Sequence, residues 1–374
     1  MFDQLFAAAS VSSMIPAYDT SNRAPIELLA AWAEDLGFDA DVQPIDGAPG
    51  KFNLVATLGR GDGGLVFAGH TDTVPWDEGR WRHDPLRATF SGDRVYGLGA
   101  ADMKGFFAVL FDALRGLDAG RLAAPVVLIA TADEESTMSG ARALAAHGAP
   151  RARHALIGEP TGLKPVRLHK GIQMESVRVL GHAGHTSDPS LGANAIDGMH
   201  RVIAALMDWR AELQRDHRDD AFAVPIPTLN FGHVHGGDNP NRICAACELQ
   251  FDLRPLPGMD PDALRAEFRA RAGEALAGTP FGLEFDALLG GVPPLATPAD
   301  APIVRAVEQL TGAPAGAVAF ATEGPFLAEF AGDVVVLGPG DIAQAHQPDE
   351  YLALERIAPT QTLLTGLVER LCAR

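Results

Sequence analysis

Residues 65–76 read LVFAGHTDTVPW and combine an apolar run with two polar residues at its end. The run at 65–68 predicts a buried β-strand, because it is short, continuous and followed by turn-forming residues. His70 and Asp72 are two positions apart, so on an extended chain their side chains point to the same side. They could be two ligands of one metal, a ligand and the residue that orients it, or polar residues where a strand ends.

Strands and helices alternate on both sides of this stretch. Strands are predicted at 52–59, 64–70, 124–135 and 154–160, and helices at 25–37, 104–117 and 139–148. A turn at 61–64 joins the first two strands as a hairpin would. A helix at 301–312, a strand at 333–340 and a closing helix at 356–374 restore the pattern. This alternation predicts an α/β domain that contains parallel strands.

Residues 173–292 have a different character. Their predicted strands alternate polar and apolar residues, which is typical of half-exposed antiparallel strands. Together with two helices they indicate a small α+β unit. A chain of 374 residues also exceeds what one compact core normally holds. We therefore expect a larger domain formed by 1–172 and 293–374, with a smaller domain, 173–292, inserted into it.

The composition, with 47% hydrophobic and 21% charged residues, is that of an ordinary globular protein. A net charge of −18 disfavours nucleic acid and anionic membranes as partners, because both would be repelled. No apolar run approaches the roughly 20 residues that span a bilayer. The first residues lack the basic flank of a signal peptide, and three cysteines argue against a disulfide framework. We expect a cytoplasmic protein with a small-molecule substrate.

Residue types that bind metals recur at the carboxyl ends of the predicted buried strands or in the loops beside them. They are His70, Asp72, Asp102, Glu134, Glu135, Glu159 and His346. Ligands bind at this edge of an open α/β sheet, so these residues are expected to meet in one cleft. Imidazoles and carboxylates suit Zn²⁺. The excess of carboxylates further suggests two metals that share a bridging carboxylate, with a water between them.

Each residue also has a structural explanation when taken alone. His70 could be a core histidine, Asp102 a helix N-cap, and the pair Glu134-Glu135 the acidic start of a helix. Glu159 could belong to a turn before proline, and His346 to a surface loop. These explanations do not account for such residues at five strand ends. Cys244 and Cys247 form a C-x-x-C pattern without a second pair, so we interpret them as core residues.

The chain also carries six motifs in a characteristic order. They are GHTDTVPW, YGLGAADMKGFFA, TADEES, IGEPT, GHAGHTSDP and LGPGDIAQAHQPDEYL. In order and spacing they resemble the zinc-dependent aminoacylase, carboxypeptidase and desuccinylase metallohydrolase family, over nearly the whole chain. The resemblance implies a mixed-sheet di-zinc aminopeptidase/carboxypeptidase-like catalytic domain with an inserted ferredoxin-like α+β domain. That inserted domain would cover the site and form a homodimer, and Co²⁺ could substitute for Zn²⁺.

The resemblance also implies a ligand set. His70 and Glu159 would hold one ion, Glu135 and His346 would hold the other, and Asp102 would bridge the two. Each ion would then have one imidazole, one carboxylate of its own and the shared carboxylate.

The same resemblance gives roles to residues around the ions. Glu134 would be the general base, and Asp72 would accept a hydrogen bond from the imidazole of His70, which fixes its tautomer. The peptide bond that follows the bridging aspartate, here Asp102-Met103, is expected to be cis.

The implied substrate is a small N-acyl amino acid. His185 matches a histidine that reaches the partner subunit's site and stabilises the oxyanion. Asn241 and Arg254 match residues that bind the substrate carboxylate, a task that suits the planar guanidinium. Glu323, in ATEGPF, is our own inference as the group that receives a substrate ammonium.

Three stretches, GGDNPNRICAACELQFDLRPLPG, ATEGPF and AHQPDEYL, are most similar to family members that deacetylate N2-acetyl-L-ornithine. The products would be acetate and L-ornithine, which feeds arginine synthesis. Alternatives within the family are a succinyl-diaminopimelate desuccinylase, a broad aminoacylase and a dipeptidase. A non-catalytic relative is a further alternative, but it should have lost the base or a ligand, and the sequence retains all six.

Overall fold

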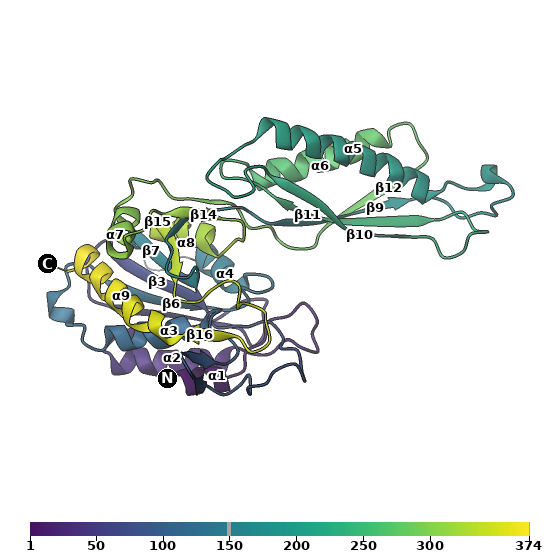
Figure 1. Cartoon of the computed structure of the whole chain (residues 1–374). Coiled ribbons are helices and arrows are strands. Elements are labelled where there is room, and N and C mark those ends of the chain that lie inside the picture. Colours follow the sequence, from purple (N-terminus) through teal and green to yellow (C-terminus); the bar gives the residue numbers. More distant parts are fainter. Residues whose placement is uncertain (148–150, 374) are drawn as a thin grey trace. The chain divides into compact units, whose positions relative to one another are not determined.

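The computed structural model describes residues 1–147 and 151–373 and divides the chain into two compact units (Figure 1). Unit 1 comprises Met1–Arg167, Thr297–Gly316 and Thr322–Arg374. Unit 2 comprises Leu168–Ala296 and Ala317–Ala321. Unit 2 therefore begins and ends a few residues outside the boundaries 173 and 292 that the sequence favours.

A mixed nine-stranded sheet has the order β1-β2-β6-β3-β7-β15-β8-β13, with β14 paired to β8. The strands are β1 (Asp39–Pro44), β2 (Phe52–Leu58), β3 (Leu65–His70), β6 (Val126–Thr131), β7 (His154–Pro160), β8 (Val166–His169), β13 (Leu295–Ala296), β14 (Gly316–Val318) and β15 (Asp333–Gly338). Its central strands β6, β3, β7 and β15 are mutually parallel. The mixed α/β architecture expected from the sequence is confirmed.

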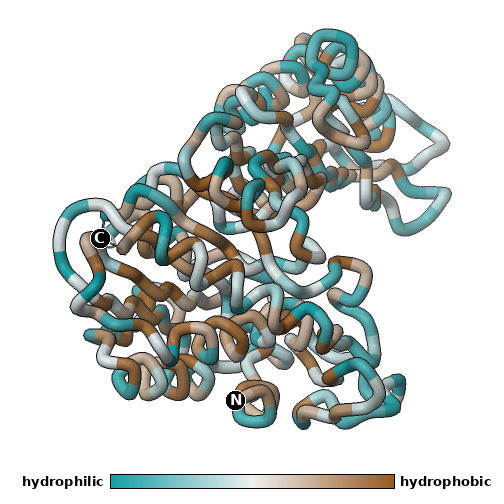
Figure 2. The backbone as a smooth tube through the Cα atoms, turned by 60° about the vertical axis from the view of Figure 1, so that its left-hand side comes forward, coloured by the Kyte–Doolittle hydropathy of each residue, from teal (hydrophilic) through white to brown (hydrophobic). Residues whose placement is uncertain are grey.

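The short turn after β2 does not form the expected hairpin. β6 lies between β2 and β3, antiparallel to the first and parallel to the second. Every residue of β3, β6 and β7 is buried. A position in the middle of the sheet stabilises such strands most, because both of their faces are then covered. The hydrophobic segments gather in the interior of unit 1 in Figure 2.

Helices cover the two faces of this sheet (Figure 1). On one face α3 contacts α1, α2 and α9, and α7 contacts α9, whereas α4 contacts α8 on the other. The helices are α1 (Phe2–Ala7), α2 (Arg23–Asp35), α3 (Lys104–Leu114), α4 (Ser139–His147), α7 (Pro302–Thr311), α8 (Gly324–Ala331) and α9 (Ile357–Leu371). Helix α7 follows its sequence signals, because Pro302 begins it and Gly312 ends it at a φ of 69°.

Short elements complete unit 1. A three-stranded sheet has the order β16-β5-β4, formed by β4 (Thr89–Ser91), β5 (Arg94–Tyr96) and β16 (Tyr351–Ala353). The described residues also form the 3₁₀ helices η1 (Ala119–Arg121), η2 (Pro189–Leu191) and η3 (Leu354–Arg356), the second of which lies in unit 2.

Unit 2 is an antiparallel sheet, order β10-β11-β9-β12, packed against two helices. Its elements are β9 (Gln173–Leu180), α5 (Ala195–Asp216), β10 (Thr228–Gly236), β11 (Ala246–Arg254), α6 (Pro261–Ala275) and β12 (Gly282–Ala287). Burial alternates along β11, as expected for a strand with one face on a core. Trp209 and Phe268 fill that core, which also contains the free cysteines Cys244 and Cys247.

The helices carry no membrane-spanning signal. Within residues 1–147 and 151–373, none combines the length and the apolar character needed to cross a bilayer.

Candidate active site

Three parallel strands deliver the site residues to one edge of the sheet. His70 is the last residue of β3, and Glu159 is the next to last residue of β7. Glu134 and Glu135 lie in the turn after β6. Because β6, β3 and β7 are adjacent and parallel, their carboxyl ends lie side by side, at the edge where α/β sheets bind ligands.

The turn after β6 separates the two neighbouring glutamates. The strand expected to reach Glu135 ends at Thr131, because Asp133 adopts a left-handed φ of 60°. The carbonyl of Asp133 accepts hydrogen bonds from the amides of residues 136–138, at 3.3, 3.0 and 2.5 Å. Aspartate tolerates this conformation better than most residues. Glu134 and Glu135 thus take their different positions from a turn and not from the strand.

The first half of the cluster surrounds His70. Its Nε2 lies 3.1 Å from Oδ1 of Asp102 and 3.8 Å from Oε1 of Glu159. Ligand atoms of His70, Glu134 and Glu159 lie within 4.8 Å of one another. Oε1 of Glu159 is buried and has no hydrogen-bond partner among the residues that the structure describes. An acceptor left in this state indicates a site for a cation.

The second half contains His346, which follows β15 at the same edge. Its Nε2 lies 3.0 Å from Oε2 of Glu135 and 3.6 Å from Oδ2 of Asp102. The two oxygens of Asp102 therefore face different imidazoles, Oδ1 facing His70 and Oδ2 facing His346. The arrangement corresponds to the bridging position that the family resemblance implies for Asp102.

The electrostatics of the cluster also fit a cation. Burial raises the pKa of Glu134 and of Glu159 well above the ordinary value, and nearby carboxylates raise both further. Burial opposes the charged form of His70, but its hydrogen bond to Asp102 and the surrounding carboxylates raise its pKa well above the usual value. The hydrogen bond to Glu135 raises the pKa of His346 to about 9. Divalent cations would relieve this crowding of negative charge, so the donor set fits metal ions.

Asp72 differs from its expected role in one detail. Nδ1 of His70 lies 2.9 Å from the main-chain carbonyl of Asp72, but 3.7 Å from its carboxylate oxygen Oδ1. The hydrogen bond that orients the imidazole is therefore made to the main chain. The carboxylate instead accepts a hydrogen bond from the amide of Glu135 at 3.1 Å. Asp72 thus connects the end of β3 to the turn that carries Glu135.

The loop that carries Asp102 is held by Glu350, a residue that the sequence analysis missed. The buried carboxylate of Glu350 accepts hydrogen bonds from the amides of Gly99, Ala101 and Asp102, at 2.9, 2.7 and 2.9 Å. Its position four residues after His346, in AHQPDE, was the available signal. The Asp102-Met103 peptide bond is cis, as the resemblance implies.

A pocket lies beside His346. Its volume is about 210 Å³, and its lining includes Val74, Trp76, Trp81, His346 and Glu350. Residues 74–76 belong to the stretch that follows His70, so the pocket lies next to one of the clustered imidazoles. It offers apolar and aromatic walls to a small organic group.

Glu323 is buried near the cluster, where its charge, in addition to their burial, raises the pKa of Glu134 and of Glu159. Its side chain is 0% exposed, and Oε1 accepts a hydrogen bond from the hydroxyl of Thr131. Burial raises its pKa to about 7. Its second oxygen, Oε2, is buried without a hydrogen-bond partner among the described residues, and its role toward a substrate ammonium stays a prediction. The sequence could not reveal the burial, because ATEGPF resembles an exposed loop.

The remaining expected residues belong to unit 2. His185 and Asn241 lie on neighbouring segments, since His185 forms a β-bridge with Arg242. Arg254 ends β11, where its Nε donates to Asp252 at 2.7 Å. Asn241 lies five residues before β11 begins, and Arg254 is the last of the nine residues of that strand. The strand alone spans roughly 25 Å at the usual rise per residue. This separation is too large for the two residues of one chain to bind the same carboxylate, and their role in binding the substrate stays a prediction.

The comparisons with known proteins agree with this site. The model of peptidase family M20/M25/M40 matches residues 66–370. The chain is 48% identical to an acetylornithine deacetylase of Edwardsiella ictaluri, over 100% of this chain and 97% of that protein. It is also 48% identical to an acetylornithine deacetylase of Pasteurella multocida, with the same two shares covered.

Solved structures share the fold. The aminopeptidase PepT of Bacillus cereus has a TM-score of 0.75 at 18% identity, covering 99% of this chain and 97% of its own. A dinuclear metal-binding M20 peptidase of Bacillus subtilis has a TM-score of 0.66 at 16% identity, covering 98% and 96%. The family match over most of the chain, the full-length relatives and the cluster of candidate metal ligands lead to one conclusion. The chain belongs to peptidase family M20/M25/M40 and is a metal-dependent hydrolase.

Proposed function

We propose that this hydrolase cleaves the N-acetyl amide of N2-acetyl-L-ornithine to give acetate and L-ornithine. The names of its full-length relatives support the substrate. The single observation that supports the chemistry is the position of the Asp102 carboxylate between the imidazoles of His70 and His346. That arrangement suits two cations separated by one carboxylate.

We propose Zn²⁺ as the metal, with Co²⁺ as a substitute, because the donors are imidazoles and carboxylates. His70, Glu159 and Asp102 would hold one ion, and Glu135, His346 and Asp102 would hold the other. When bound, zinc lowers the pKa of a coordinated water toward about 7 and polarises the carbonyl of the substrate.

We assign the role of general base to Glu134. Ligand atoms of Glu134, His70 and Glu159 lie within 4.8 Å of one another, yet the two proposed metal sites are complete without Glu134. Burial raises its pKa, which brings its proton affinity closer to what proton transfer near neutral pH requires. Glu134 would take a proton from the attacking water and then deliver it to the leaving amine of ornithine.

We further propose that the enzyme is a homodimer formed through unit 2. The separation of Asn241 from Arg254 along β11 supports this, because residues from two chains could meet on one substrate carboxylate where one chain cannot. β10 is an edge strand of the four-stranded sheet. On this strand Val234 is 58% exposed, and Ile196, at the start of α5, is 46% exposed. His185 would then reach the partner's site and donate a hydrogen bond to the oxyanion.

The dimer can be tested by sedimentation. The wild type should sediment as a dimer, and Val234→Asp should shift it toward the monomer with a large loss of activity. A wild type that is monomeric and fully active would contradict the proposal.

We place the reaction in the cytoplasm, as a step of arginine biosynthesis that supplies ornithine. The three cysteines are free and buried, which suits a reducing compartment.

Substrate choice is tested by comparing kcat/KM for four compounds on one zinc-loaded preparation. N2-acetyl-L-ornithine should exceed N-acetyl-L-methionine, N-succinyl-diaminopimelate and a dipeptide by at least about tenfold. A preference for the succinyl compound would indicate a desuccinylase, and equal values for the acetyl compounds would indicate a broad aminoacylase. Either result would overturn the proposed substrate while leaving the metal chemistry intact.

A further inference from the structure

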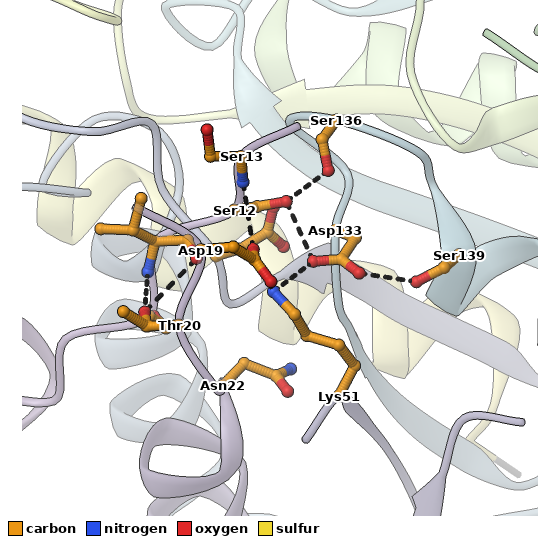
Figure 3. A network of polar contacts seen from close by, with 12 residues as sticks. Ser12, Ser13, Asp19, Thr20, Asn22, Lys51, Asp133, Ser136 and Ser139 are labelled. Carbon is orange, nitrogen blue, oxygen red and sulfur yellow. Dashed lines mark hydrogen bonds and ion pairs between the residues drawn. The ribbon is translucent and has the colours of Figure 1, made fainter. Parts of the chain in front are cut away.

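A buried lysine lies behind the turn that carries Glu134 and Glu135. Nζ of Lys51 is 2.7 Å from Oδ1 of Asp19 and 2.6 Å from Oδ1 of Asp133, and its side chain is 4% exposed (Figure 3). Burial opposes its charge, but the hydrogen bonds to Asp133 and Asp19 keep the pKa of Lys51 above its ordinary value. The lysine is therefore a fixed positive charge next to the residue that precedes Glu134.

Asp133 is held by more than this ion pair. Its Oδ1 accepts a hydrogen bond from the hydroxyl of Ser12, and its Oδ2 accepts one from the hydroxyl of Ser139, both at 2.9 Å (Figure 3). The hydroxyl of Ser12 also contacts that of Ser136 at 2.5 Å. The carboxylate therefore joins the two ends of the turn to each other and to Lys51.

The same network reaches the strand that carries His70. The amide of Ser12 donates to the carbonyl of Thr73 at 2.9 Å, and the amide of Thr73 donates to the carbonyl of Ser10 at 3.0 Å. Residues 10–12 thus pair with the segment that follows β3, while the Ser12 hydroxyl binds the turn after β6. The network fixes the turn relative to the end of the neighbouring strand.

We propose that Lys51 and Asp133 are positioning residues that set the placement of Glu134 and Glu135. Neither belongs to the expected ligand set, and Lys51 acts on the turn through its ion pair with Asp133. The left-handed Asp133 determines the direction in which the next two residues leave the strand. Without the ammonium, a buried carboxylate would lose its charge partner, which is strongly unfavourable. The turn would shift, and a misplacement of about 1 Å can cost about 10²-fold in rate.

The kinetic test of this proposal rests on the proposed function, because it measures turnover of N2-acetyl-L-ornithine. The spectroscopic test does not depend on the substrate. Lys51→Met should lower kcat on N2-acetyl-L-ornithine about 10- to 100-fold and change KM less than about threefold, because it disturbs the base and not the substrate contacts. The visible absorption of the Co²⁺-loaded protein should also change, since Glu135 lies on the same turn. Lys51→Arg should recover much of both properties, because it restores the charge.

A matched control variant tests whether Lys51 contributes only to stability. Arg265 forms a 2.6 Å ion pair with the buried Glu175 in unit 2, so Arg265→Met breaks a comparable contact in another part of the chain. It should lower Tm as Lys51→Met does, but leave kcat and the Co²⁺ spectrum unchanged. If Lys51→Met fails to fold, Ser12→Ala is the second variant. This smaller change should lower kcat about three- to tenfold and alter the spectrum.

Two results would overturn the proposal. One is a folded Lys51→Met protein whose kcat and Co²⁺ spectrum match the wild type. The other is a Ser12→Ala protein with both properties unchanged. Should the wild type fail to hydrolyse N2-acetyl-L-ornithine, the proposed function falls, but the spectral comparison of Lys51→Met with Arg265→Met still tests the positioning role.

Discussion

Nε2 of His346 lies 3.0 Å from the carboxylate of Glu135, although the two residues are 211 positions apart in the sequence. The imidazole comes from the loop after β15, and the carboxylate comes from the turn after β6. Two strands that are not adjacent in the sheet thus contribute to one half of the site. This contact depends on the fold, and it brings together the two side chains that we propose as ligands of the second metal alone.

His346→Ala should reduce the bound metal from two equivalents to one, because it removes the imidazole of that position. Metal content after dialysis against a trace of Zn²⁺, measured by atomic absorption, checks this. His147→Ala, at the end of α4, removes a histidine outside the cluster and should still bind two equivalents. Two tightly bound equivalents in His346→Ala would show that His346 is not a ligand.

Glu134→Gln should keep both metals and lose about 10²- to 10⁴-fold in kcat, the range typical of a missing general base. The amide retains the size of the side chain but cannot accept the proton. Steady-state kinetics on protein of verified metal content give the answer. Turnover close to that of the wild type would remove Glu134 from the mechanism.

Asp72→Asn and His70→Ala should have different effects on metal binding. His70→Ala should abolish one metal position. Asp72→Asn should weaken binding by about 10- to 100-fold, as changes behind a ligand usually do. It keeps the main-chain carbonyl that contacts Nδ1 of His70, but it weakens the link to the amide of Glu135 and removes a negative charge 3.7 Å from that imidazole. Zinc titrations by calorimetry distinguish the two, and equal effects would contradict these assignments.

His169 gives unit 2 a pH-dependent stability. It is 0% exposed, and burial lowers its pKa to about 4 from 6.5. The unfolded chain therefore binds this proton more readily, so the stabilisation is complete above pH 6.5 and is lost as pH falls toward 4. The shift corresponds to about 3 kcal/mol.

The measurement is the urea midpoint of unfolding at pH 7 and at pH 4.5 for wild type and His169→Asn. The difference between the two pH values should be smaller in the variant, while His217→Asn, at an exposed position after α5, should behave as wild type. Equal pH dependence in wild type and His169→Asn would refute the assignment.

Much of the architecture could be predicted because buried strands leave a clear pattern. LVFAGH, VVLIAT and HALIGEP are continuously apolar up to their polar ends, and the structure places all three as adjacent parallel strands. The order of strands could not be predicted in the same way. The hairpin expected from the turn at 61–64 is absent, because β6 pairs with both of the strands that this turn connects.

The identities of the site residues could be predicted from the sequence, but the contacts that they make could not. The seven polar residues at strand ends could be read from the sequence, since each interrupts an apolar pattern. The burial of Glu323 and the main-chain bond of Asp72 depend on packing, which no local pattern encodes. Lys51 and Glu350 were missed for the same reason, because a lone charged residue gives no sign that its charge is buried.

The most direct test of the account is the release of L-ornithine from N2-acetyl-L-ornithine by the purified protein, before and after metal removal. The account predicts hydrolysis by the zinc-loaded protein, loss of nearly all activity after treatment with a chelator, and recovery when Zn²⁺ or Co²⁺ is returned. Full activity in protein shown to be free of metal would contradict it, as would the absence of ornithine release from protein that holds two equivalents of zinc.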